Sequence, residues 1–220
     1  MEGAPVAVAS VLEHHAAVPR WLDIMSVVLL SVAALASAWC TYQAALWDGL
    51  QAEQYTIVGE RNVDAALASA KAGQQQMVDV GMFMNWLSAY ADGKTDVTSF
   101  YERRFRAEFV PAFRAWVASE PRRNRAAPPT PFVLPEYRLA ERERANQLTA
   151  DATRAFGEGR AANQRGDDYV LDTVVLASVL FLAGIAQQAP RLAMRKAITA
   201  VALVILVGAV ARIATSPLAP

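Results

Sequence analysis

The stretch that decides the fold is residues 24–47, IMSVVLLSVAALASAWCTYQAALW, which contains no charged side chain. A helix of about 20 mainly apolar residues, rising about 1.5 Å per residue, crosses the roughly 30 Å hydrocarbon core of a bilayer. Two more uncharged stretches follow near the end of the chain, residues 173–190 and 197–211. The last one reaches a crossing length only if the basic side chains that flank it extend to the interfaces. The pattern predicts an all-α membrane protein with three transmembrane helices, at residues 21–47, 169–190 and 196–214.

The distribution of charge supports this division. Over the whole chain, 21 Lys and Arg balance 21 Asp and Glu, and most of both signs lie in residues 48–168. This central region therefore has no basic excess that would attract nucleic acid. The single cysteine, Cys40, lies in the first apolar stretch, which excludes an intrachain disulfide and a cysteine zinc site.

The N-terminus is expected to be a flexible tail over residues 1–20. Within it His14 and His15 are adjacent, so on a helix they would point about 100° apart and would not form a paired metal site. The small residues around Ser37 resemble a signal-peptide cleavage site. The apolar stretch is longer than a signal core, however, and continues to Trp47 without a break, so we expect an uncleaved anchor.

Residues 48–168 are predicted to form a long extramembrane helical hairpin. No proline lies between Trp21 and about Ala91, so one nearly continuous helix is expected to lead out of the first membrane segment. Near its end, residues 77–87 form a patch rich in Met and aromatic side chains.

A second amphipathic helix is expected from about Thr95 to Trp116, kinked at Pro111, with aromatic residues three and four positions apart on one face. This face either packs on the patch at 77–87 as a small core or lies among lipid headgroups, and we favour the core.

Five prolines in residues 121–135 predict a stiff, extended connector over residues 120–135. A return helix is expected to start at Pro135 and to continue into the second membrane segment. About seven residues separate the last two membrane segments, which favours an antiparallel helical pair. Residues 215–220 are expected to be a short C-terminal tail.

The orientation follows from Arg191, Arg195 and Lys196, which cluster in the short loop between the last two membrane segments. Cytoplasmic loops carry an excess of Lys and Arg. The N-terminus and the 191–196 loop are therefore expected in the cytoplasm, although arginines at 160, 165 and 212 oppose this orientation.

The remaining candidate residues lie at the membrane boundaries. Asp23 and Asp172 are the carboxylates nearest to membrane depth, where an ionisable group can relay protons. Both also lie in the first turns of their helices, where a hydrated carboxylate is favoured, and we prefer this interpretation. The others form a polar and aromatic belt that either lines a pore mouth, binds a headgroup or, as we favour, anchors the helices at the interface: Tyr42, Gln43, Trp47 and Tyr169.

No Gly-rich phosphate loop, nucleophile elbow or metal-ligand spacing occurs in the chain. The sequence therefore predicts no catalytic residue, no cofactor, no metal site and no enzymatic activity. Small residues such as Ala34 and Ala38 favour close helix packing, either within one chain or between copies.

Three runs, SAWCTYQAA at 37–45, FYERRF at 100–105 and DDYVL at 167–171, resemble a family of uncharacterised bacterial inner-membrane proteins with a domain of unknown function. The similarity covers most of the chain. It implies three transmembrane helices, a helical extramembrane segment and the bacterial inner membrane, and it implies no activity and no functional residues.

Two main classes of function follow, and an enzyme or sensor whose site forms only between copies is a third, less supported one. The first is a self-associating structural or accessory membrane subunit whose helical extramembrane domain contacts a membrane-protein partner. The second is an oligomeric ion-conducting or stator-like force-coupling assembly, although the membrane segments lack the internal acid and threonines expected along a proton path. The lipid bilayer and further copies of the chain are the expected partners, and nucleic acid is not.

Overall fold

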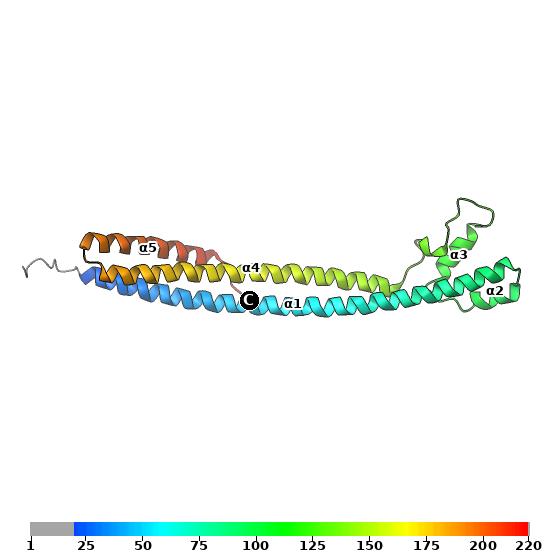
Figure 1. Ribbon diagram of the computed structural model, residues 1–220, viewed down its shortest axis with the longest axis horizontal. Helices are drawn as coiled ribbons and strands as arrows, with labels where there is room; N and C mark the ends of the chain where they lie inside the picture. Colours follow the sequence, from blue (N-terminus) through cyan, green and yellow to red (C-terminus); the bar gives the residue numbers. More distant parts are fainter. Residues whose placement is uncertain (1–19, 220) are drawn as a thin grey trace, which may run out of the picture. The chain divides into compact units, whose positions relative to one another are not determined.

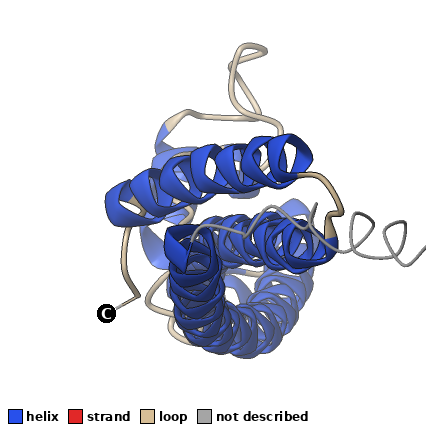
Figure 2. Cartoon of the chain, turned by 90° about the vertical axis from the view of Figure 1, so that its left-hand side faces the viewer, coloured by secondary structure: helices blue, strands red, loops and turns tan. Residues whose placement is uncertain are grey.

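The computed structural model describes residues 20–219. All the regular secondary structure in this part of the chain is helical (Figure 2). The all-α prediction is confirmed. The expected N-terminal tail, with His14 and His15, lies outside the described residues except for Arg20, which begins a helix. The described elements are α1 Arg20–Ala91, α2 Thr95–Glu102, α3 Val110–Ala118, the 3-10 helix η1 Pro131–Val133, α4 Ala140–Gln188 and α5 Leu192–Thr215.

Helix α1 runs for 72 residues without interruption, as its lack of proline predicts. It ends where Gly93 adopts a left-handed backbone with φ of 72°, a conformation that glycine takes at little cost. The Lys94 N–H donates to the Ala89 carbonyl at 2.9 Å and the Gly93 N–H donates to the Tyr90 carbonyl at 3.3 Å. This glycine-capped end satisfies the last carbonyls of the helix and turns the chain toward α2.

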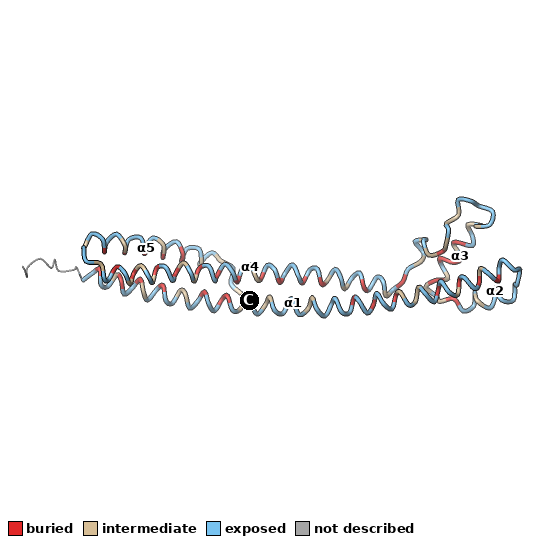
Figure 3. The backbone as a smooth tube through the Cα atoms, in the orientation of Figure 1, coloured by how far each residue is buried: buried red, intermediate tan, exposed pale blue. Residues whose placement is uncertain are grey.

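The contacts divide the chain into two compact units. Of the described residues, unit 1 comprises 20–53 and 158–219, and unit 2 comprises 54–157. Helices α1 and α4 contribute to both, and Figure 1 shows them side by side. Where α1 and α4 run side by side, the buried positions follow the faces that the two helices turn toward each other (Figure 3).

Unit 1 is a bundle of α1, α4 and α5 around a core of small and aliphatic side chains. The buried positions of α4 within the bundle, 162, 166, 169, 172, 176, 179, 183 and 186, recur at intervals of three and four residues, which keeps them on one helix face. A methyl group added at Gly166 would lie 3.1 Å from Asp48 Oδ1 and 3.7 Å from the Ala44 carbonyl, so α1 and α4 approach closely there. The buried core consists of Leu29, Ala33, Cys40, Ala44, Trp47, Ala162, Tyr169, Leu176, Val179, Ala183, Ala202, Leu206 and Ala209.

Unit 2 begins with an alanine-lined pairing of α1 and α4. Two polar contacts join the start of α4 to α1: Lys71 pairs with Glu141, and Arg142 donates to Gln76 Oε1 at 2.9 Å. The alanines buried in the two helices allow close packing with little loss of side-chain entropy: Ala65, Ala68, Ala72, Ala145, Ala152 and Ala155.

The single helix expected from Thr95 to Trp116 is wrong. Two short helices, α2 and α3, are separated by a non-helical segment at residues 103–109. Pro111 lies in the first turn of α3, where its missing N–H costs nothing, and so it starts a helix instead of kinking one. The break also lets Arg106 turn toward Asp79 of α1.

The connector at 120–135 is folded rather than extended. Arg123 and Asn124 N–H groups both donate to the Glu120 carbonyl, at 2.8 and 2.9 Å, and η1 follows. The return helix starts at Ala140, later than Pro135, because Tyr137 is held by a turn to the Leu134 carbonyl and by a side-chain bond to Asp79. Only residues 189–191 separate α4 from α5, fewer than expected.

Candidate functional site

The tip of unit 2 contains an aromatic core contributed by the end of α1, by α3 and by the segment around η1. Phe83 is central: its ring centroid lies 5.1 Å from that of Trp116 and 5.6 Å from that of Phe132, with the ring planes almost perpendicular. Such edge-to-face pairs add stability beyond the area they bury. The interpretation of the aromatic face as a core is the one supported by these contacts. Its buried members are Phe83, Trp86, Phe105, Phe109, Phe113 and Trp116.

Both tryptophans of this core have their indole N–H groups occupied. Trp86 Nε1 donates to Glu102 Oε1 at 2.9 Å, and Trp116 Nε1 donates to the Pro128 carbonyl at 2.8 Å. A buried indole with its polar end satisfied presents only ring surface to its surroundings. The two bonds also attach α2 and the connector to the core.

A buried carboxylate lies beside the aromatic core. Asp79 Oδ2 accepts hydrogen bonds from Arg106 Nη1 and from the Tyr137 hydroxyl, each at 2.9 Å. Arg106 also pairs with Glu108, whose other oxygen accepts a bond from the Ala140 N–H at the start of α4. The cluster therefore ties together α1, the segment between α2 and α3, and α4.

The environment changes the acidity of this cluster. Burial raises the pKa of the Asp79 carboxyl above its ordinary value, and the bonds from Tyr137 and Arg106 only partly oppose that change. Burial and the bond to Asp79 likewise raise the pKa of the Tyr137 hydroxyl. Because Asp79 Oδ2 and the Tyr137 hydroxyl already take part in hydrogen bonds within the cluster, we assign the cluster a structural role.

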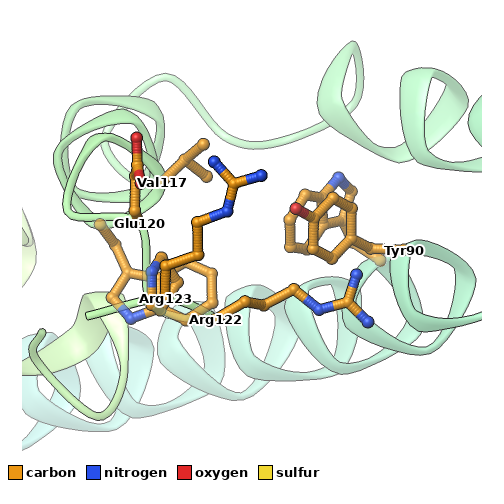
Figure 4. Close-up of a pocket in the computed structure, with 8 residues that line it drawn as sticks. Tyr90, Val117, Glu120, Arg122 and Arg123 are labelled. Carbon is orange, nitrogen blue, oxygen red and sulfur yellow. The ribbon is translucent and has the colours of Figure 1, made fainter. Parts of the chain in front are cut away.

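A pocket of about 450 Å³ opens next to the aromatic core. Figure 4 shows the side chains of Arg122 and Arg123 extending from one turn into the space between α3 and Tyr90 of α1. Its other lining residues are Trp86, Trp116, Val117, Glu120 and Pro121. An adjoining cavity of about 330 Å³ shares Tyr90, Trp116, Pro121 and Arg122 and adds Arg125.

The pocket is electropositive at its rim and aromatic at its base. The Arg122 guanidinium carbon lies 4.9 Å from the centroid of the Tyr90 ring, a cation–π contact. Glu120 is the one acidic residue that lines the pocket. Within residues 20–219 no group of three or more His, Cys, Asp or Glu is placed to hold a metal ion.

Two of the residues singled out from the sequence form an ion pair in unit 1. Arg195 Nη2 of α5 lies 2.5 Å from Asp23 Oδ1 of α1, and the side chain of Arg195 is almost fully buried. The two residues are 172 positions apart in the chain, so no sequence spacing indicates their contact.

The other carboxylate forms a second pair. Asp172 Oδ1 accepts a bond from Arg212 Nε at 2.6 Å, and Arg212 also donates to the Asp168 carbonyl at 3.0 Å. The Asp172 side chain is buried. Both candidate carboxylates are thus charge-paired. Asp23 lies in the first turn of α1 with an exposed side chain, as expected. The same expectation is wrong for Asp172, because α4 begins at Ala140 and Asp172 lies buried in the interior of that helix.

The polar and aromatic belt separates into contacts with different partners. The Tyr169 hydroxyl donates to the Pro217 carbonyl at 3.1 Å, and Gln43 Oε1 accepts a bond from the Ala219 N–H at 3.0 Å. These two contacts hold the segment after α5 against α1 and α4. Trp47 is buried under the guanidinium of Arg165, 4.7 Å from its ring centroid.

The remaining candidates stay exposed. Tyr42 faces outward next to Trp39, with 6.0 Å between ring centroids. Arg191 caps the N-terminus of α5 through its backbone, and Lys196 lies on the outer side of that helix. These three are not brought together with the other candidates.

The cluster around Asp79 and the arginine-lined pocket were both missed in the sequence. One signal was available: Asp79 is the only charged residue between Lys71 and Asp92, in a patch otherwise rich in apolar side chains. A single acid in an apolar patch that becomes buried is expected to pair with a basic residue. The arginines at 122, 123 and 125 were interpreted only as part of a connector.

Comparison with protein-family models, with curated proteins and with solved structures finds no match to this chain. Any assignment of function therefore depends on the residues themselves. Three helices of the described residues, α1, α4 and α5, are long and apolar enough to cross a membrane. The fold is therefore of a kind found in multi-pass membrane proteins.

Proposed function

We propose that the chain is a multi-pass integral membrane protein of the bacterial inner membrane, with transmembrane helices at residues 21–47, 169–190 and 196–214. The observation that carries the proposal is the exposed outer face of unit 1. Apolar side chains point away from the bundle, and no more than a third of each membrane-length window is buried inside the chain. Examples are Leu35, Val174, Phe181, Val204 and Val207. Lipid is the solvent that such a surface requires.

The positions of the two ion pairs support the proposed placement of the bundle across the membrane. Arg195 and Arg212 are 17 positions apart on α5, or about 26 Å at about 1.5 Å per residue. That length is close to the roughly 30 Å of a hydrocarbon core. Because Asp23 pairs with Arg195 and Asp172 with Arg212, the charges lie at the two ends of the apolar segment and neutralise each other there.

The orientation follows from the basic residues next to α5. With Arg191, Arg195 and Lys196 in the cytoplasm, the N-terminus is also cytoplasmic and unit 2 lies on the opposite side. We test this with single-cysteine variants in a Cys40→Ala background. A membrane-impermeant maleimide should label Ala126→Cys in intact spheroplasts and label Ala193→Cys only after permeabilisation. The reverse pattern would contradict the orientation, and labelling of both in intact spheroplasts would contradict the spanning topology.

We further propose that copies of the chain associate through unit 2. A stripe of uncharged residues, which we call the outer stripe, runs along the exposed face of α1 at intervals of four, three, four, three, four and three residues. This is the spacing of a coiled-coil seam. Val63, Leu67, Met77 and Met84 are 61, 65, 75 and 57% exposed. The complete stripe is Val63, Leu67, Ala70, Gln74, Met77, Gly81 and Met84.

A second copy fits this stripe because the surface can meet itself. Copies inserted in one membrane share an orientation, so their α1 helices pair in parallel and each stripe residue meets its own counterpart. No stripe residue is charged, which avoids like-charge contacts at a two-fold axis. Asp64 and Lys71 flank the stripe with opposite charges, Lys71 pairs with Glu141, and Asp79 is buried. Gln74, with an amide donor and acceptor, can bond its counterpart and fix the register.

The test measures copy number for the full chain in lipid nanodiscs by particle imaging and mass photometry. The wild-type protein and the control variant V97E/V133E, which places two acids on exposed apolar positions outside the stripe, should be multimeric. The variant L67E/M77E should be monomeric, because carboxylates would meet across the seam.

A crosslinking experiment tests the parallel arrangement. Oxidation should join two copies through Ala70→Cys in the stripe and should not join them through Ser69→Cys beside it. Equal crosslinking at both positions, or a multimer that persists in L67E/M77E, would reject the outer stripe as the interface. A closed ring with a hydrated axis in the particle images would favour the ion-conducting or force-coupling alternative over an accessory subunit.

A further inference from the structure

We propose that the pocket between α3 and the end of α1 binds a phosphate monoester that carries an aromatic ring. Arg122 and Arg123 would hold the phosphate, and the rings of Trp86, Tyr90 and Trp116 would contact the aromatic group. This proposal is independent of membrane insertion and of self-association, because it depends only on residues within unit 2.

The first support is unmatched positive charge. Residues 103–125 contain seven arginines and two glutamates, although the whole chain is neutral. Among those seven, Arg106 is the one that forms an ion pair in the described structure. Arg122, Arg123 and Arg125 line one pair of adjoining cavities with Glu120 as the acid present, so the cavities carry a positive excess of two charges. A phosphate monoester carries between one and a half and two negative charges at about pH 7.

The second support is geometric. Two consecutive arginines line the same pocket, and Figure 4 shows one guanidinium directed toward Tyr90 and the other toward α3. Two like charges that line one pocket favour an anion bound between them. Guanidinium forks form two parallel hydrogen bonds to phosphate, which makes arginine the suitable residue for this ligand.

The third support is an aromatic base that is already fixed. The indole N–H groups of Trp86 and Trp116 bond Glu102 and the Pro128 carbonyl. Trp86 and Trp116 are otherwise buried, so the small part of each indole that lines the pocket and the partly exposed Tyr90 ring are the aromatic contact surface for a ligand. The pocket volume of about 450 Å³ lies within the range of small-molecule sites.

The fourth support is an ordered arginine turn. Glu120 has φ of 50°, a conformation rarely adopted by residues other than glycine, and its carbonyl accepts the Arg123 and Asn124 N–H groups. The Asn124 side chain closes the turn on both sides, donating to the Ser119 carbonyl at 3.2 Å and accepting from the Ala126 N–H at 2.9 Å. Because the backbone is held in place, binding needs to order only the arginine side chains.

The experiment uses 4-fluorophenyl phosphate as the probe and follows its ¹⁹F resonance during titration with the full-length protein in dodecyl maltoside micelles at constant ionic strength. A ligand of this size is expected to bind with a Kd of about 0.1–1 mM. The variant R122Q/R123Q should weaken binding at least tenfold. Inorganic phosphate should displace the probe only at concentrations at least tenfold above those of unlabelled phenyl phosphate, because it lacks the ring.

The matched control is R103Q/R104Q, which removes the same charge from exposed arginines of unit 2 that do not line the pocket. It should bind the probe within twofold of the wild-type protein. The variants alter exposed side chains, and near-ultraviolet circular dichroism of the aromatic core verifies that they are folded. Equal weakening by both double variants, equal potency of inorganic and phenyl phosphate, or absence of binding up to about 10 mM would each overturn the proposal.

Discussion

Replacing Arg106 by glutamine is expected to destabilise unit 2 by about 2–3 kcal/mol. Removing one partner of a buried ion pair costs about 3–5 kcal/mol, because the other charge is left without compensation. The cost expected for Arg106→Gln lies below that range because the Arg106 side chain is 24% exposed and Tyr137 still donates to Asp79. The variant Asp79→Asn should cost less than about 1 kcal/mol, since its amide oxygen still accepts hydrogen bonds and the buried charge is removed.

The assay is hydrogen exchange with mass spectrometry on full-length protein in nanodiscs, read on peptides from residues 105–137. At about 1.4 kcal/mol per factor of ten, the Arg106→Gln variant should exchange about 30- to 150-fold faster than wild type. The double variant D79N/R106Q should exchange more slowly than R106Q alone, because the uncompensated carboxylate is gone. Equal effects of D79N and R106Q, or an unchanged rate in R106Q, would refute the assignment of Asp79 as a buried charge that depends on Arg106.

Three further outcomes follow from the acidity of unit 2. Because the folded-state pKa of Asp79 is raised, this carboxyl should add stability as pH falls from neutral and lose it as pH rises through that pKa, and near-ultraviolet melting curves should lose this contribution in D79N. The raised pKa of Tyr137 should delay its ionisation in an alkaline absorbance titration at 295 nm, so Tyr137→Phe should remove the last tyrosine to ionise, and unchanged late absorbance would contradict the buried hydroxyl. The bond from Lys71 lowers the pKa of Glu141, so this pair should stabilise the protein above the ordinary carboxyl pKa and lose that effect as pH falls. The difference in melting temperature between wild type and K71Q should therefore shrink at low pH and at high salt. A difference that does not depend on salt would argue against a simple exposed pair.

Helix boundaries could be predicted where local composition decides them. The absence of proline between Trp21 and Ala91, with Gly93 after it, was sufficient to predict the extent of α1. Pro111 was interpreted as a kink because a proline in a periodic pattern can either bend a helix or start one. The choice depends on Arg106, which leaves the helix to pair with Asp79.

The site residues show the same limit. Asp23 and Asp172 could be selected as unusual carboxylates from their position beside apolar stretches. Their partners Arg195 and Arg212 are far away in the chain, and only the packing of α5 against α1 and α4 brings them within hydrogen-bond distance. Arg122, Arg123 and Arg125 form no recognisable spacing motif. They line a pocket only because a turn places them beside aromatic rings of another helix.

The sequence by itself determined the all-helical fold, the three helices of membrane length and the neutral, charge-rich central region, because each of these depends on local composition and on periodicity along the chain. Tertiary structure alone decided which charges are neutralised, which aromatic rings form the core of unit 2, and which apolar residues remain on its surface. The physical reason is that burial and ion pairing depend on the distance between side chains far apart in sequence, and a single sequence specifies that distance only through the complete packing of its helices.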